Sequence, residues 1–153
     1  MSFEKSLLLA ALDEAFDKKS WHGPNLRGAI RGVSVEQAAW RPAGDRRNIW
    51  ELTLHAAYRK YVVRRRLLKE RRGSFVLAGS NFFERPERGV ISEAAWKKDS
   101  AILEAEHRKL RDAISKFADQ ALTAAACHSI RGAAAHDLYH AGQIRLLRRM
   151  CRG

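Results

Sequence analysis

The segment NIWELTLHAAYRKYVVRRRL, residues 48–67, has the pattern of a long amphipathic helix. Asn48 can cap its first turn, and Glu51 stands at the third helical position, where it completes a capping box. Apolar residues then recur every three or four positions until Gly73 interrupts the pattern. The sequence therefore predicts a helix that begins at Asn48 and ends at about Arg72.

Three further segments, at about 3–19, 92–117 and 131–149, show the same helical spacing of apolar residues. Residues 24–47 form a compound connection with two short helices, one of them capped by Ser34 with Gln37 three residues on. Residues 73–91 look irregular, and no stretch alternates as a strand does. We predict an all-α fold: a four-helix bundle, up-down-up-down, with short extra helices between the first two long ones.

The bulk composition fits one globular domain over residues 1–153. Hydrophobic residues make up 46% of the chain, and no apolar run is long enough to cross a bilayer. Met1–Ala10 lacks the basic and then apolar layout of a signal peptide. The two cysteines, Cys127 and Cys151, have neither metal nor redox spacing, so a cytoplasmic location is expected, with no membrane contact.

The chain is strongly basic, with 29 Lys and Arg residues against 17 Asp and Glu and a formal net charge of +12. The cations gather in residues 59–72 and 145–152, at helix C-termini where the helix dipole favours them. If the second and last helices are parallel, both clusters lie at one end of the bundle. A non-catalytic bundle that binds nucleic acid or a protein through this end is the alternative function. Few aromatic residues are interleaved, so nucleic acid is not the expected partner.

Two histidines stand four residues apart in HDLYHAGQI, residues 136–144. His136 and His140 therefore share one helix face, on which two imidazoles can hold one metal ion. His55 lies on an apolar face of the second helix, roughly 10 Å from its start at 1.5 Å per residue, and the pair lies roughly 8–14 Å into the last helix. These depths match if the two helices are parallel. A metal site of His55, His136 and His140 is the hypothesis, and buried hydrogen-bonded histidines are the alternative.

Other candidate residues surround these three. Asp137 can orient a ligand histidine or be a surface carboxylate near the helix N-terminus, and Gln143 is placed to line the cavity. Trp50 and Tyr58 flank His55 and are read as core aromatics in preference to substrate contacts. His22 and His128 fall in connections expected at the metal end. Either can be a fourth ligand or an acid/base group, and His22 is also a candidate substrate contact, but both are read as solvated or next to the ligands. His107, on the charged third helix, is expected at the surface.

The segments SWHGPNLRGAI, VEQAAWRP, NIWELTLHAAYRKYVVRRRL and AAHDLYHAGQIRLLRR together resemble the DinB/YfiT-like superfamily over nearly the whole chain. The resemblance implies a four-helix bundle whose metal is bound by one histidine of the second helix and two of the last. Those positions here are His55, His136 and His140. It further implies one divalent ion, nickel, zinc or iron, and a homodimer.

Characterised members of that family include transferases and isomerases that use a low-molecular-weight thiol, and others are described as metal-dependent hydrolases. Three neutral nitrogens leave coordination positions open, which is the layout of a catalytic rather than a structural site. The expected function is thus that of a metal-dependent enzyme, a thiol transferase or hydrolase acting on a small electrophilic substrate.

Overall fold

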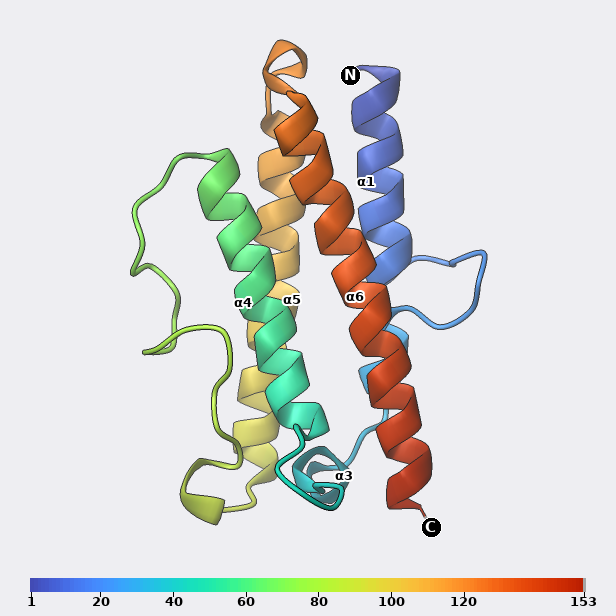
Figure 1. Ribbon diagram of the computed structural model, residues 1–153, viewed down its shortest axis with the longest axis vertical. Helices are drawn as coiled ribbons and strands as arrows, with labels where there is room; N and C mark the ends of the chain where they lie inside the picture. Colours follow the sequence, from blue (N-terminus) through green and yellow to red (C-terminus); the bar gives the residue numbers. More distant parts are fainter. Residues whose placement is uncertain (153) are drawn as a thin grey trace.

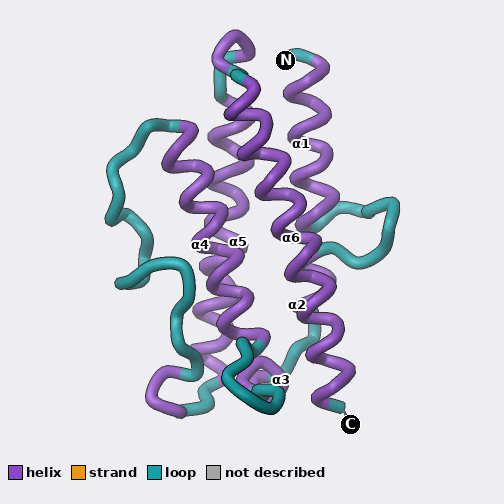
Figure 2. The backbone as a smooth tube through the Cα atoms, in the orientation of Figure 1, coloured by secondary structure: helices purple, strands orange, loops and turns teal. Residues whose placement is uncertain are grey.

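Four long helices pack side by side in the computed structural model, which describes residues 1–152 (Figure 1). They are α1 (Phe3–Phe16), α4 (Ile49–Leu67), α5 (Glu93–Lys116) and α6 (Ala124–Cys151). The short helices α2 (Leu26–Ile30) and α3 (Val35–Ala39) lie between α1 and α4, and the single turns η1 (Glu87–Gly89) and η2 (Asp119–Ala121) precede α5 and α6. No strand occurs within these residues, so the all-α bundle is confirmed (Figure 2).

The helix starts follow the capping signals of the sequence. Ser34 with Gln37 and Asn48 with Glu51 each form a complete capping box at the starts of α3 and α4. The last helix is longer than predicted: it begins at Ala124, capped by the side chain of Thr123, and not at about residue 131. The first helix ends earlier, at Phe16, and α4 ends at Leu67.

The helix directions differ from the predicted alternation. Figure 1 shows α1 and α6 running down the view while α4 and α5 both run up it. Hydrogen bonds agree, because Trp50 contacts Asp99 near the starts of α4 and α5 and Lys60 contacts His107 further along both. The up-down-up-down order is therefore wrong.

The reason is the connection over residues 68–92, which returns along the outside of the bundle before α5 begins (Figure 2). At about 3.3 Å per residue a chain of this length can extend about 80 Å, well beyond the roughly 28 Å of α4. Short loops force neighbouring helices to be antiparallel, and this connection is not short.

Because α4 and α6 are antiparallel, their C-terminal ends lie at opposite ends of the bundle (Figure 1). The basic clusters at 59–72 and 145–152 are thus separated by the length of the molecule, and the expectation that they share one end is wrong. Within residues 1–152, no helix combines the length and apolar character that crossing a bilayer requires.

Candidate metal centre

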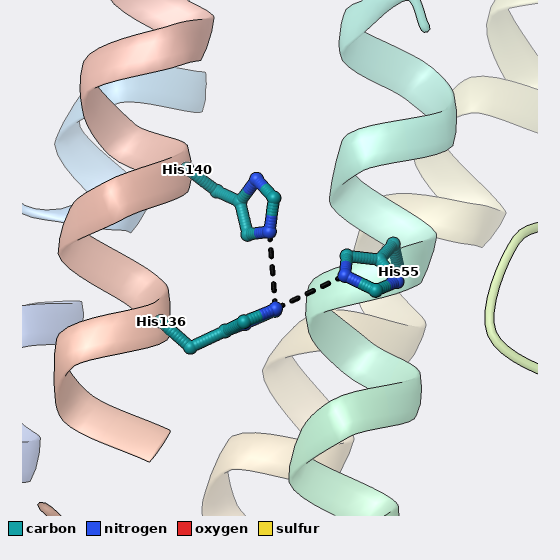
Figure 3. Close-up of side chains that lie close together, drawn as sticks. All are labelled: His55, His136 and His140. Carbon is teal, nitrogen blue, oxygen red and sulfur yellow. Dashed lines mark hydrogen bonds between the residues drawn. The ribbon is translucent and has the colours of Figure 1, made fainter. Parts of the chain in front are cut away.

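Three histidine side chains from α4 and α6 converge between these two helices (Figure 3). His55 projects from α4, and His136 and His140 project from successive turns of α6. Nε2 of His136 lies 3.0 Å from Nε2 of His55 and 3.0 Å from Nε2 of His140. The structure therefore brings together the three residues that the sequence singled out.

The assumption of parallel helices that led to the depth comparison does not hold. His55 lies in the first half of α4, and the pair lies near the middle of α6, which starts seven residues earlier than predicted. The antiparallel arrangement brings these levels together, as Leu52 and Leu147 line one cavity next to His140.

The rings of His55 and His140 are each held in one tautomer by a hydrogen bond from Nδ1. Nδ1 of His55 donates to the main-chain carbonyl of Asn81 over 2.9 Å, and Nδ1 of His140 donates to Oε1 of Gln143 over 2.6 Å. A neutral imidazole that donates from Nδ1 presents a lone pair at Nε2. Both lone pairs point at His136, as a pair of metal ligands would.

This donor set fits a cation. Of the three converging nitrogens, only Nε2 of His136 can bear a hydrogen. That hydrogen can be donated to Nε2 of His55 or to Nε2 of His140, but not to both. At least one contact of 3.0 Å therefore joins two lone pairs. Nitrogens bound at 2.0–2.1 Å to a tetrahedral zinc ion lie about 3.3 Å apart, close to the spacing found here. The three rings are thus spaced to accept a divalent ion.

Burial keeps the three rings neutral. His55 and His140 are 7% and 5% exposed. Loss of solvation is the main cause that lowers the pKa of His55 to about 4 and that of His136 to about 3, and it also lowers the pKa of His140. Near neutral pH, protons therefore do not compete for the nitrogens that would hold a metal.

The connection over residues 68–92 forms one wall of the centre. Besides the Asn81 carbonyl it supplies Phe82, whose ring stacks on His55 at 4.1 Å between centroids. Arg85 ties this segment to α5 through Asp99 and is hydrogen bonded through its carbonyl to the Asn48 side chain. No helical or strand periodicity marks these residues in the sequence, although two adjacent phenylalanines in a polar stretch are a signal of packing.

Asp137 does not reach the three imidazoles. Its side chain accepts a hydrogen bond from Lys60 of α4 in the bundle interior. Lys60 also donates to Nδ1 of His107, and His107 stacks on Phe16 at 3.8 Å. His107 is only 3% exposed, so its expected surface position is wrong. His107 lies on the buried face of α5 with Leu103 and Leu110, although charged residues are its neighbours in the sequence.

The remaining candidates have different surroundings. Gln143 lines the cavity beside His140, as expected. Trp50 is a core residue whose indole donates to Asp99, and Tyr58 is half-buried and packs its ring against the core. His22 is exposed in the connection after α1 and does not line the cavity, and His128 is exposed on the first turns of α6 rather than in a connection.

The structure is thus a four-helix bundle with one histidine on α4 and two on α6 placed so that they could hold a metal ion. The model of the DinB superfamily matches residues 20–144, and the chain belongs to that superfamily. Comparisons with curated proteins and with solved structures give no significant match.

Proposed function

We propose that this chain is a metal-dependent enzyme in which His55, His136 and His140 hold one divalent ion, nickel, zinc or iron. The observation that carries the proposal is the convergence of three Nε2 atoms. In His55 and His140 a hydrogen bond from Nδ1 leaves Nε2 unprotonated, so that its lone pair is free to bind a metal. The reaction class is inferred from other members of the superfamily, which work as thiol-dependent transferases or as hydrolases. We expect a thiol or water to attack a small electrophile.

A divalent ion on three imidazoles supplies a Lewis acid that makes water or a thiol nucleophilic near neutral pH. The chain's own residues prepare the centre for it. Asn81 and Gln143 hold the tautomers of His55 and His140, and Phe82 covers the face of the His55 ring. The cavity beside His140 gives a substrate access from one side of the centre.

Metal content is the first test. We expect near-stoichiometric metal in tag-free protein, and its loss in His55→Ala and in His140→Ala. His128→Ala is the matched control, since it removes an exposed histidine from the same helix as His140. Failure of the wild-type chain to retain zinc, nickel or ferrous iron after reloading would overturn the proposal.

The reaction class is tested on the same samples. Metal-loaded protein is incubated with an electrophile, 1-chloro-2,4-dinitrobenzene, and a thiol, and with activated esters in the absence of thiol. Turnover that needs both the metal and the thiol supports transfer, whereas turnover with water alone supports hydrolysis. Equal rates for wild type and His55→Ala in both assays would contradict an enzymatic role for the centre.

A further inference from the structure

A cavity of about 780 Å³ opens beside the three histidines. It lies between the segment before α4 and the C-terminal half of α6, and His140 and Gln143 form part of its wall. Its size is within the range of pockets that enclose small organic molecules. Its lining shows which chemistry such a molecule would have.

One wall is apolar and open to solvent. Tyr139, Leu146 and Met150 follow one another along α6 and are 65%, 59% and 48% exposed. Leu52 and Phe82 face the same space from α4 and from the connection after it. Single exposed apolar side chains are common on protein surfaces, but several gathered together mark a binding surface, and here they line a cavity of ligand size.

The opposite rim is cationic. Arg46 and Arg47 line the cavity together with one acid, Asp45, so these three side chains sum to a charge of +1. The guanidinium carbon of Arg47 lies 4.3 Å from the centre of the Phe82 ring, on the side chain that also stacks on His55. Arg47 is therefore close to the metal centre, and its charge is among those that lower the pKa of His55.

The backbone that carries these arginines is fixed. Arg41 donates to the carbonyl of Arg46 over 2.6 Å and forms a bidentate pair with the buried Glu51 at the start of α4. In the described part of the chain, no hydrogen bond or ion pair involves the Arg46 guanidinium, and Arg47 has only a long contact of 3.9 Å with Glu51. The backbone at the rim is thus fixed, while the donors of both guanidinium groups are largely uncommitted.

We infer that this cavity binds an amphipathic organic monoanion, an aryl- or alkyl-carboxylate. Its apolar body packs on Tyr139, Leu146 and Met150, and its carboxylate pairs with Arg46 and Arg47. A guanidinium matches a carboxylate bidentately, and the +1 charge of the rim matches a single negative charge. The inference rests on the proposed function, since it names the substrate class of the same centre.

Calorimetric titration with three probes of one shape tests the inference: 4-phenylbutyrate, 4-phenylbutanamide and 4-phenylbutylamine. Each is titrated into zinc-loaded and chelator-treated protein. We expect the carboxylate to bind at least 10-fold more tightly than the amide in both forms, and the amine to bind more weakly still. Equal affinities for carboxylate and amide would overturn the inference.

Two double variants locate the effect. Arg46→Gln/Arg47→Gln is expected to lose at least 10-fold in affinity for the carboxylate and to keep its affinity for the amide. Arg71→Gln/Arg72→Gln removes the same charge from exposed positions at the far end of α4 and should leave both unchanged. An equal loss in the two double variants would reduce the effect to net charge and overturn the inference.

The metal content of the same samples separates the two proposals. If the protein holds metal but shows no preference for the carboxylate, the proposed function stands and this inference is overturned. If the protein prefers the carboxylate through Arg46 and Arg47 but holds no metal, the ligand class stands and the proposed function is overturned.

Discussion

Lys60 of α4 and Asp137 of α6 form an ion pair in the bundle interior, and each side chain is 1% exposed. Asp137 directly follows the candidate ligand His136, and its second oxygen has no hydrogen-bond partner among the described residues. Burial raises the pKa of Asp137 to about 6, against the opposing effect of Lys60. The pair therefore joins the two helices that carry the candidate metal ligands. Removing both charges from water has a high desolvation cost.

Breaking this pair should destabilise the fold strongly. Asp137→Asn leaves the Lys60 ammonium buried without a counter-charge, and we expect about 3–5 kcal/mol less free energy of unfolding, measured by urea denaturation of metal-free protein. The double variant Lys60→Met/Asp137→Leu should recover most of that loss. The single variants Lys60→Met and Asp137→Leu complete the cycle, and a double variant whose loss equals the sum of their two losses would show that the residues do not interact.

Removing the Gln143 side-chain acceptor should weaken metal binding without removing a ligand. Gln143→Leu leaves Nδ1 of His140 without its partner, so the ring is no longer held with its lone pair at Nε2. We expect zinc affinity to fall roughly 10–100-fold in a competition assay with a chromogenic chelator. Gln120→Leu, at an exposed position in η2, is the control and should bind zinc as the wild type does.

Stability should fall with acid partly because of His107. Burial, and then the charge of Lys60, lowers the pKa of His107 to about 3, whereas the unfolded chain protonates this ring near pH 6.5. Below pH 6.5 the unfolded state thus binds a proton that the folded state excludes, so stability decreases as pH falls towards 3. Between pH 7 and pH 5 one such ring accounts for about 2 kcal/mol.

The variant His107→Phe, which can keep the stack on Phe16, tests this assignment. Its loss of unfolding free energy between pH 7 and pH 5 should be smaller than that of the wild type by about 2 kcal/mol. His128→Phe changes an exposed histidine and serves as the control. An unchanged pH slope in His107→Phe would assign the acid sensitivity to other groups.

Chelation should lower the melting temperature. A ligand at 100 times its dissociation constant stabilises the folded state by about 2.7 kcal/mol, which corresponds to about 5–10 °C for a domain of this size. We expect that difference between zinc-loaded and chelator-treated wild type by thermal unfolding. His136→Ala should melt at the same temperature with and without zinc, and a zinc effect that persists in it would place the ion elsewhere.

Much of the fold could be predicted from local signals. The spacing of apolar residues identified the four long helices, and the capping boxes at Asn48 and Ser34 marked the starts of α4 and of the short α3. The direction of α5 could not be predicted in the same way, because it depends on where the connection over residues 68–92 packs. The start of α6 was missed because an alanine-rich first turn has no apolar periodicity, and only Thr123 marks it.

The centre shows a similar division. His136 and His140 were found from their spacing, and His55 from its apolar helix face and the family resemblance. The groups that support the ligands could not be found from spacing or periodicity. Asn81 contributes a main-chain carbonyl, and Phe82 lies in a segment without periodicity. The direction of Asp137 was also unpredictable, since it depends on Lys60, 77 positions away in the chain.

The long connection between α4 and α5 also makes this bundle divisible. Ser74, Val76, Ala78 and Gly79 are exposed, and a cut among them would leave every helix intact. The N-terminal fragment would carry His55, and the C-terminal fragment would carry His136 and His140. Each fragment of such a split protein would contain only part of the candidate ligand set. An ion bound by all three histidines would therefore link the two fragments and favour their reassembly.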